Sequence, residues 1–440
     1  MTADPNRKVD HPTLSRRTFL GLAAGVAAFP AVVPASALGR GKRAAPSNRI
    51  VMGHIGVGGQ GMQHVVGGIW TQAGGMTGRD DTQVVAVCDV NRQRLQNAKQ
   101  QVDQRYGTTD CAAYTDFREL LARKDIDAVL IATGERWHQL LSIAAARAGK
   151  DIYCEKPLSV TIEEALAVRE AIERYGVVFQ MGTQQRSSHA FRFACEIVRN
   201  KRIGDLKEVV VGVAGGPALP DCHLPAQPVP EWLDYDMWLG PAPWRSYNES
   251  IVFGWMAYRD FSGGEMTNWG AHHFDIAQWG IGADDTGPVE IVPPNGKDVK
   301  VMTYHYANGV TVTRDPERTS RESPDGNGVV FVGTKGKVAV WRYDLKTWPE
   351  SLKATPTGPN EIHLHEAENH HTDFLNAVRT RGVPSAPVNV GARSITVSHL
   401  GNIAYELGRP VKWDPKTVRF VNDPEADRLY ARQMRAPWHL

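Results

Sequence analysis

The sequence predicts an α/β protein with an N-terminal doubly wound parallel sheet, followed by a C-terminal α+β domain whose sheet is largely antiparallel. Three observations lead to this fold class. A glycine-rich turn near residue 56 lies between an apolar strand segment and a helical segment. Strand and helix segments then alternate to about residue 180, as in a parallel sheet with helical crossovers. Beyond residue 185 short strand segments cluster, some joined by hairpin-like turns.

The first 37 residues have the order of regions of an export signal. The run SRRTFL at residues 15–20 is a twin-arginine pattern, an apolar stretch covers residues 21–33, and a small-residue cleavage site follows at residues 35–37. A membrane anchor is the alternative, but glycine and proline interrupt the stretch, which is short for a bilayer. We predict a twin-arginine signal peptide over residues 1–37 and a linker over residues 38–48.

Export would place the mature chain in the periplasm or another extracytoplasmic space, with no stable membrane span after processing. The 440-residue chain is 42% hydrophobic and 22% charged, as in ordinary globular proteins. It holds 50 basic and 48 acidic residues, and cleavage after Ala37 would remove four and two of these, leaving a formal net charge of zero. This balance argues against a nucleic-acid partner. The five cysteines form no CxxC pair, which argues against a disulfide framework.

The glycine-rich turn predicts a dinucleotide site. An apolar strand segment over residues 49–56 runs into GVGGQG, and a helical segment follows. Strand, GxGxxG and helix in this order form the Rossmann fingerprint. We expect Gly56 to permit the tight turn, Gly58 and the neighbouring Gly59 to lie where the backbone approaches a pyrophosphate, and Gly61 to allow close helix packing.

An acidic residue follows the second strand segment. Residues 84–88 are apolar and end at Asp89, where a carboxylate holds the adenine ribose hydroxyls and favours NAD over NADP. Asp89 lies 28 residues beyond Gly61, and a loop-like insert over residues 71–81 explains a spacing longer than the usual value of about 20. The alternative is a surface aspartate that caps the helix beginning near Asn91.

The alternation continues to the end of a domain predicted over residues 49–184. We expect helices over residues 91–105, 115–123, 135–148 and 161–175, and strands over residues 127–133, 151–153 and 177–180. Ligands of such sheets bind at the carboxyl ends of the strands. The candidate cofactor residues at or just after these ends are Thr133, Trp137, His138, Glu155 and Lys156. Lys156, held between a strand end and a proline, is also the candidate proton shuttle.

Residues 185–440 are predicted to form the second domain. We expect a helix over residues 187–200, a strand over 209–214, a long Pro- and Trp-rich loop over 217–247, strands over 289–294, 299–306, 309–314, 328–333 and 337–342, and helices over about 369–381 and 391–407. The tail has no clear assignment.

A second chemical cluster lies between Gly263 and Asp275. On a helix Asn268 and His272 share one face, and His272 and Asp275 are three residues apart. A histidine so placed can exchange a proton with a substrate hydroxyl near neutral pH. The spacing alone favours the alternative, in which the histidines bond to backbone or neighbouring polar groups.

The run HLHEAENHH at residues 363–371 contains possible metal ligands. It has no HExxH pattern and lies between a loop and a helix start. It therefore favours a solvated or cleft-facing helix entry, and we predict no metal site.

These motifs together resemble the Gfo/Idh/MocA oxidoreductase family. The resemblance covers nearly all the chain from about Arg49 and rests on the strand-GxGxxG-helix, on Glu155-Lys156-Pro157 and on the GG…GxH segment around His272. The Trp-rich stretch at residues 232–247 and the ending RAPW at residues 435–438 are similar to an exported, twin-arginine-bearing branch found in sugar-degrading bacteria.

The resemblance implies an NAD cofactor with Lys156 near the nicotinamide and the reacting carbon. There the positive ring would disfavour the ammonium, so the lysine could act as a base. The family also has an aspartate four residues before a histidine. His272 matches the histidine, but Asn268 stands at the aspartate position, and an amide cannot balance an imidazolium charge. His272 is then a weaker base, or Asp275 or His273 shares its role.

Export would also limit the chemistry, because no free NAD pool is expected outside the cytoplasm. We expect an NAD-dependent oxidoreductase that acts on a carbohydrate or cyclic polyol with a tightly bound cofactor. The alternative is an NAD-using glycoside hydrolase that borrows and returns a hydride within one turnover. A sugar-binding protein without turnover is supported only by Asn268 and opposed by Lys156. The sequence leaves open the particular sugar and whether the chain forms a homo-oligomer.

Overall fold

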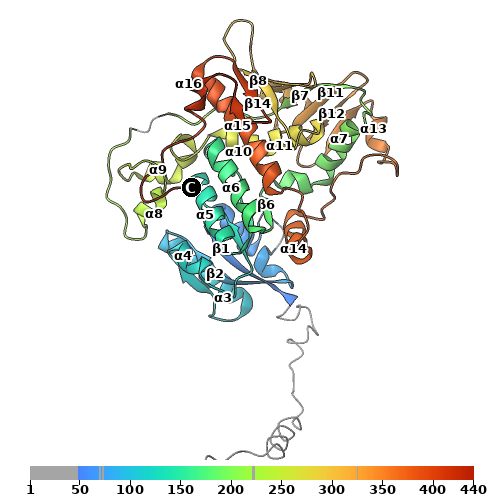
Figure 1. The fold of residues 1–440 in the computed structure, drawn as a ribbon. Coiled ribbons are helices and arrows are strands. Elements are labelled where there is room, and N and C mark those ends of the chain that lie inside the picture. The colour runs from blue at the N-terminus through green and yellow to red at the C-terminus, as the bar shows by residue number, and fades with distance from the viewer. Residues whose placement is uncertain (1–47, 69–70, 72–73, 221–222, 325) are drawn as a thin grey trace, which may run out of the picture. The chain divides into compact units, whose positions relative to one another are not determined.

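A six-stranded parallel sheet forms the N-terminal part of the structure (Figure 1). The computed structural model describes residues 48–440 except 69–70, 72–73, 221–222 and 325, so the predicted signal peptide and residues 38–47 of the predicted linker lie outside the described residues. The strands are β1 (Ile50–Ile55), β2 (Thr82–Cys88), β3 (Ala112–Tyr114), β4 (Ala128–Ile131), β5 (Asp151–Cys154) and β6 (Phe179–Met181), in the order β3-β2-β1-β4-β5-β6.

The crossover segments follow the predicted alternation. They contain α2 (Gly59–Val66), the 3-10 turn η2 (Met76–Gly78), α3 (Arg92–Tyr106), α4 (Phe117–Leu121), α5 (Glu135–Arg147) and α6 (Ile162–Tyr175). Strands β4 and β5 are buried throughout, as expected for parallel strands covered on both faces. The strand order reverses between β1 and β4, and ligands bind at the carboxyl ends of strands at such a switch point.

A nine-stranded mixed sheet lies in the C-terminal part of the described chain. Its strands are β7 (Leu206–Val211), β8 (Pro288–Val292), β9 (Met302–Tyr306), β10 (Thr311–Arg314), β11 (Val329–Gly333), β12 (Lys337–Val340), β13 (Leu345–Trp348), β14 (Val411–Asp414) and β15 (Arg419–Phe420), in the order β13-β12-β11-β7-β10-β9-β8-β14-β15. The β7–β10 pair is parallel and the other neighbouring pairs are antiparallel. The predicted fold class is therefore confirmed.

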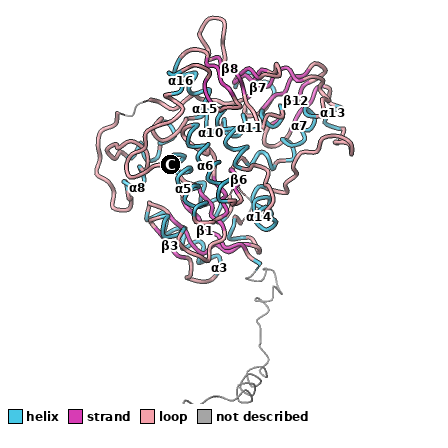
Figure 2. The backbone as a smooth tube through the Cα atoms, viewed as in Figure 1, coloured by secondary structure: helices cyan, strands magenta, loops and turns pink. Residues whose placement is uncertain are grey.

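Helices and short turns accompany this second sheet. They are η3 (Gln184–Ser187), α7 (His189–Arg199), α8 (Tyr235–Leu239), α9 (Glu249–Phe253), η4 (Trp255–Ala257), α10 (Glu265–Asn268), α11 (Gly270–Ile281), α12 (Pro316–Glu322), α13 (Ser351–Ala354), α14 (His370–Thr380), α15 (Val388–Leu407) and α16 (Pro424–Asp427). Figure 2 shows the loops and turns that join the short elements α8 and α13 to the rest of the chain.

Helix α15 joins the two sheets. It packs against α11 on one side and against α6 on the other. Accordingly, one apolar cluster contains Ile131 and Cys154 of the first sheet together with Ala271 of α11 and Ile395 of α15. This shared core fixes α11 relative to the carboxyl ends of β4 and β5.

Several short elements differ from the predictions. Strands β3, β13, β14 and β15 and helix α16 were not predicted, because two to four residues are too few to show a periodic pattern. The helix predicted over residues 187–200 is α7, which begins one residue after Ser188, where the backbone is extended, and the unpredicted turn η3 precedes it. The predicted loop over residues 217–247 contains α8, which Asp234 caps.

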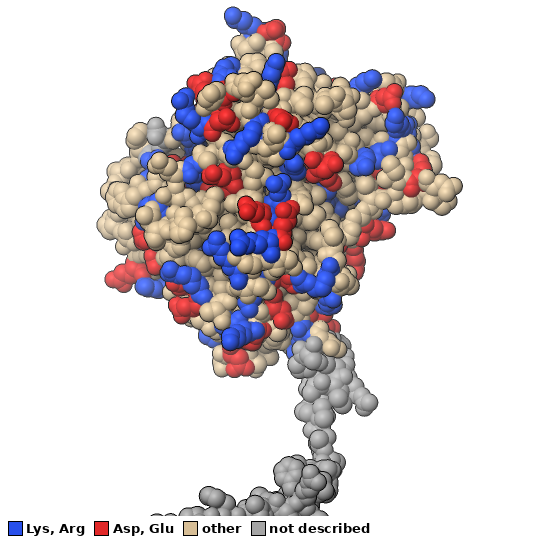
Figure 3. Space-filling view, viewed as in Figure 1, with Lys and Arg blue, Asp and Glu red and all other residues tan. Residues whose placement is uncertain are grey.

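The described surface carries charges of both signs. Figure 3 shows Lys and Arg side chains interspersed with Asp and Glu side chains on the face in view. Among the described helices, none combines the length and the apolar character needed to cross a bilayer.

Candidate active site

The glycine-rich turn brings α2 very close to β1. The backbone of Gly56 has a positive φ of 85°, and a Cβ there would lie 2.6 Å from the carbonyl oxygen of Ala132. A Cβ on Gly61 would lie only 2.0 Å from the carbonyl oxygen of Gly56. Both positions therefore require glycine. Gly59 faces open space, and the first-turn N–H groups of α2 have no partner within their own helix, so a phosphate can approach them.

A cavity of about 480 Å³ lies over this turn. Six predicted cofactor residues line it, namely Gly56, Gly58, Gly59, Asp89, Thr133 and Trp137. Residues of the C-terminal part close the other side, among them Trp238, Phe253 and Trp255. The cavity has the place and the lining of a dinucleotide site.

Asp89 ties the end of β2 to the glycine-rich turn. Its Oδ2 accepts a hydrogen bond from Val57 N at 2.9 Å, and its Oδ1 accepts one from Asn91 N at 2.8 Å. Burial raises the pKa of Asp89, against the effect of these hydrogen bonds and of the Arg94 charge. The N-cap of α3 is Asn91, so Asp89 does not have the capping position that the alternative required. A carboxylate on this wall fits the ribose hydroxyls of NAD.

Trp137, His138 and Gly61, three of the predicted cofactor residues, help to hold the walls of the cavity in place. Trp137 donates from Nε1 to the carbonyl oxygen of Met237 at 3.0 Å and packs edge-on against Trp438. His138 is buried, with its ring nitrogens 2.6 Å from the carbonyl oxygen of Pro157 and 3.0 Å from that of Thr133. His138 and Gly61 line neither cavity described here. They hold the cavity walls together.

A larger cavity of about 680 Å³ adjoins the first. Glu155, Lys156, Asn268 and His272 line it together, as the sequence predicted for the two chemical clusters. The two cavities share the lining residues Gln60, Ala132, Thr133, Trp255 and Met256. A dinucleotide bound over the glycine-rich turn therefore has a direct route to Lys156.

Lys156 is held by the residue that departs from the family pattern. Its Nζ donates a hydrogen bond to Asn268 Oδ1 at 2.5 Å, and Asn268 Nδ2 donates to Glu265 Oε2 at 3.2 Å. Burial lowers the pKa of Lys156, although the nearby carboxylates of Glu155, Glu135 and Glu265 oppose this effect. A lysine with a lowered pKa in a closed site is suited to accept and return a proton.

His272 faces the same cavity as a neutral side chain. Burial lowers its pKa well below the ordinary value, and the charges of Lys156 and Arg342 act in the same direction. Its Nδ1 is buried and, among the described residues, meets no hydrogen-bond partner. A buried polar atom without a partner is costly, so this nitrogen is available to a ligand.

The structure does not bring Asp275 to the cavity. Its Oδ2 accepts from Arg186 Nε at 2.8 Å and its Oδ1 from Ser394 Oγ at 2.6 Å, and both charged partners are almost fully buried. His273 likewise points elsewhere, with Nδ1 2.9 Å from the carbonyl oxygen of Gly212. Neither residue contacts His272 through these bonds, so the predicted sharing of its role has no geometric support here.

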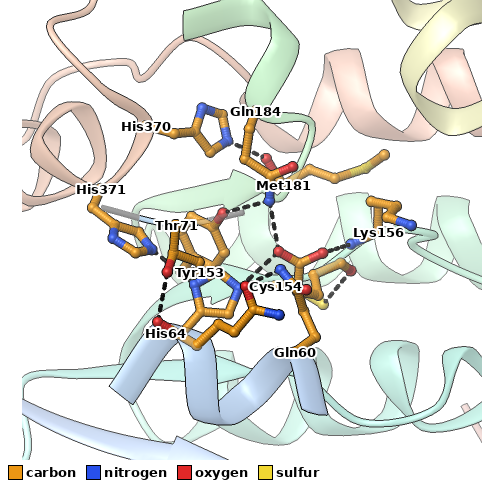
Figure 4. Close-up of polar contacts among 12 residues, drawn as sticks. Gln60, His64, Thr71, Tyr153, Cys154, Lys156, Met181, Gln184, His370 and His371 are labelled. Atoms are coloured by element: carbon orange, nitrogen blue, oxygen red, sulfur yellow. Dashed lines mark hydrogen bonds and ion pairs between the residues drawn. The ribbon is translucent and has the colours of Figure 1, made fainter. Parts of the chain in front are cut away.

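Sequence reasoning missed four polar residues at the site. Glu135 is buried beside Lys156, accepts from Ser262 Oγ at 2.5 Å, and burial raises its pKa to about 7. Gln184 donates to Glu155 Oε1 at 2.6 Å, and His64 and His371 extend from the same carboxylate (Figure 4). Two of them carried a local signal, since Glu135 and Gln184 follow the strands predicted over residues 127–133 and 177–180.

The run at residues 363–371 ends in the buried residues His370 and His371 at the start of α14. Among the described residues, no group of three or more His, Cys, Asp or Glu side chains is placed to hold a metal ion.

Two family descriptions match the chain. "Oxidoreductase family, NAD-binding Rossmann fold" matches residues 51–183, and "Oxidoreductase family, C-terminal alpha/beta domain" matches residues 219–440. Together they cover most of the chain and the lining of the dinucleotide cavity, and they leave out Gln184, Gln185, Ser188 and Phe191 of the larger cavity. They identify the N-terminal sheet as an NAD-binding domain.

Characterised relatives are similar at low identity. A myo-inositol 2-dehydrogenase from Thermotoga maritima is 26% identical over 268 residues, which is 59% of this chain and 68% of the relative. An inositol 2-dehydrogenase from Salmonella paratyphi B is 26% identical over 301 residues, 67% of this chain and 71% of the relative.

Solved structures share the fold. The aldose-aldose oxidoreductase from Caulobacter crescentus, complexed with glycerol, aligns with a TM-score of 0.56 at 17% identity and covers 83% of this chain and 99% of its own. The WlbA dehydrogenase from Bordetella pertussis, in complex with NADH and UDP-GlcNAcA, aligns with a TM-score of 0.57 at 17% identity and the same coverage. The chain thus belongs to the Gfo/Idh/MocA family of NAD-binding oxidoreductases.

Proposed function

We propose that the protein oxidises and reduces a carbohydrate or cyclic polyol with an NAD that stays bound between turnovers. The observation that carries this proposal is the meeting of Lys156, Asn268 and neutral His272 in a cavity that adjoins the dinucleotide cavity. The inositol dehydrogenases and the aldose-aldose oxidoreductase among the similar proteins support a polyhydroxylated substrate.

The residues of this chain would divide the proton chemistry. NAD, when bound, supplies the acceptor for a hydride. The neutral amine of Lys156 accepts the proton of the substrate hydroxyl during oxidation and returns it during reduction. The amide of Asn268 holds Nζ in place without adding charge. His272 offers a hydrogen bond to a neighbouring hydroxyl and so orients the sugar ring.

Retention of the cofactor is supported by the wall that the C-terminal part contributes. Arg136 donates from Nε and Nη2 to the carbonyl oxygen of Trp238, at 3.0 and 2.6 Å, and its guanidinium lies 4.0 Å from the centre of that indole ring. Arg92 N donates to the carbonyl oxygen of Trp232 at 2.8 Å. These bonds fasten the Trp-rich segment against the cofactor cavity, so release of NAD would require them to open.

Purification without added nucleotide tests retention, since denatured protein should then release close to one NAD per chain. Incubation with a panel that includes myo-inositol and glucose should next raise the absorbance of reduced nicotinamide. Protein that is empty and fails to bind added NAD would contradict the proposal. Loaded protein that no polyol reduces would remove the substrate class and leave the cofactor.

A second candidate is an NAD-using glycoside hydrolase, and the shape of the site favours keeping it. The larger cavity, which Lys156 and His272 line and which is the reaction cavity, continues past Ser188, Arg342 and Tyr343 into a further cavity of about 340 Å³. That extension offers room for the group attached to a sugar. Nitrophenyl glycosides separate the two functions, because nitrophenol release without lasting nicotinamide reduction indicates hydrolysis.

We also propose export by the twin-arginine pathway, which would make a retained cofactor necessary. The support is the SRRTFL run, the apolar stretch and the cleavage site. Expression in a bacterial host should give a periplasmic product that begins at Leu38. Replacing Arg16 and Arg17 by lysine should keep the protein in the cytoplasm at full length. Export of the double variant at the wild-type level would contradict this.

A further inference from the structure

Three buried side chains lead away from the reaction cavity (Figure 4). Glu155 lines the cavity, and its Oε1 lies 2.9 Å from His64 Nε2. The other ring nitrogen of His64, Nδ1, lies 2.8 Å from His371 Nε2. The chain thus connects the end of β5 with α2 and with the start of α14. His64 and His371 are 307 residues apart in sequence.

The three hydrogen-bonded side chains are almost completely buried. His64 is 0% exposed, Glu155 3% and His371 4%, and His371, the member farthest from the cavity, keeps a small solvent-exposed fraction. Burial opposes ionisation of Glu155, but the hydrogen bond that it accepts from His64 and the charge of Lys156 keep its pKa below the ordinary value. Burial also lowers the pKa of His371 well below the ordinary value, and the charge of Arg79 acts in the same direction.

The ionised state of Glu155 fixes the first hydrogen bond. An ionised carboxylate only accepts, so His64 donates from Nε2 to Glu155. With His64 as a neutral ring, its Nδ1 accepts and His371 donates from its Nε2. Each contact holds one proton, and both protons point toward the cavity.

We propose that Glu155, His64 and His371 form a proton relay between the reaction cavity and the outside of the fold at the start of α14. This inference rests on the proposed function, because interconversion of an alcohol and a carbonyl moves one proton in each direction. It adds to that function a route by which this proton is exchanged with solvent while substrate and cofactor close the cavity.

The proton balance is the same in both directions. In oxidation the substrate C–H bond breaks, its electron pair leaves with the hydride to NAD, and the hydroxyl proton passes to Lys156 and then, across the cavity that both side chains line, to Glu155. In reduction a proton is taken up at Nδ1 of His371, its Nε2 proton passes to His64 Nδ1, and the His64 Nε2 proton passes to Glu155. Inward transfer leaves both rings protonated at Nδ1, and release follows the same steps in reverse from that state. No other oxidant or reductant is needed.

A purely structural role for the two histidines is the competing explanation. The same bonds would then only fasten α14 to α2. His370 provides a matched control, since it is the neighbouring residue, is also buried, and bonds instead to Ser187 Oγ at 2.7 Å and to the carbonyl oxygen of Met181 at 2.8 Å.

The first test needs no substrate. Protein loaded with NAD and labelled with ¹⁵N-histidine should show His64 and His371 as neutral rings protonated at Nε2. Glu155→Gln should shift the ring nitrogens of both histidines, because an amide changes the bond at the head of the chain. Histidine signals that do not respond to Glu155→Gln would overturn the relay, whatever the enzyme oxidises.

The second test uses myo-inositol and glucose as probes in single turnovers. Nicotinamide reduction is followed by absorbance and proton release by an indicator dye. His64→Gln and His371→Gln should slow proton release roughly 10²-fold, with a smaller effect on hydride transfer, and free imidazole should restore part of the rate. His370→Gln should leave proton release unchanged when its folded fraction matches the wild type.

The outcomes separate the relay from the proposed function. Proton release at the wild-type rate in His64→Gln, or a loss that imidazole does not restore and that His370→Gln reproduces, would overturn the relay. If neither probe reduces the bound NAD, the proposed substrate class fails, and histidine signals that do not respond to Glu155→Gln would still overturn the relay.

Discussion

Lys156 and His272 face one cavity, but the protein treats them differently. Lys156 is fixed by a short hydrogen bond to Asn268 and is surrounded by carboxylates that partly offset its burial. His272 has a buried Nδ1 without a partner among the described residues, and cationic neighbours that keep it neutral. The difference indicates that Lys156 carries the proton transfer, whereas His272 waits for a ligand to complete its bonding.

Replacing Lys156 by methionine should lower turnover more than any other change discussed below. Turnover near the wild-type rate would show that Lys156 does not carry the proton transfer. The apolar side chain fills similar space without a basic group, so turnover should fall by about 10²–10⁴. Measurement of kcat with the best polyol of the panel checks the fall. NAD content should remain that of the wild type, because Lys156 lines the reaction cavity and not the dinucleotide cavity.

Replacing Asp275 by alanine should destabilise the fold. Its partner Arg186 is 2% exposed at the side chain and would keep its ion pair with Asp284, so the loss should stay below the roughly 3–5 kcal/mol of a buried charge left without any partner. Urea unfolding measures the loss. Turnover per folded molecule should stay near the wild-type value, and a selective loss of kcat with unchanged stability would return Asp275 to the catalytic site that the sequence suggested.

Glu135→Gln should change how stability depends on pH. Burial raises the pKa of Glu135 from its ordinary value of 4.5 to about 7 in the fold. The stability that protonated Glu135 contributes is fully present below the pKa of the unfolded state and is lost as the pH rises through the pKa of about 7 in the fold. Between pH 4 and 8 the wild type should lose about 3 kcal/mol relative to the variant. If the stability difference between the wild type and Glu135→Gln were the same at pH 4 and pH 8, burial would not have raised the pKa of Glu135.

Asn268→Asp should move the pH profile rather than abolish activity. A carboxylate in contact with Nζ would favour the ammonium and raise the pKa of Lys156. The pH at which kcat/KM for oxidation increases should therefore be higher by about one pH unit, and oxidation at neutral pH should be slower. Asn268→Ala is the uncharged control. Faster oxidation at neutral pH would show instead that His272 lacked a carboxylate partner.

Local patterns predicted the parts of the site that lie close together in sequence. The glycine-rich turn, Asp89 and Lys156 each follow a strand, so their common edge could be inferred from the alternation. The helical spacing also placed Asn268 and His272 on one face, and both line the reaction cavity.

Long-range partners could not be predicted in this way. Asp275 has the right spacing from His272, but Arg186, 89 residues away, turns it into a structural ion pair. The bond between His64 and His371 depends on α14 packing beside α2, which no local pattern encodes. Glu135 looked like an ordinary helix start until Ser262, 127 residues away, buried it.

The five residues shared by the two cavities have a consequence for the affinities of the two ligands. Trp255, Met256 and the other shared residues make the dinucleotide part of the wall that a sugar meets. Binding of the two ligands is then energetically coupled, and each should strengthen the other by the same factor. Chains that have lost their NAD should bind substrate more weakly, so the number of tight substrate sites in a preparation should fall with its NAD content.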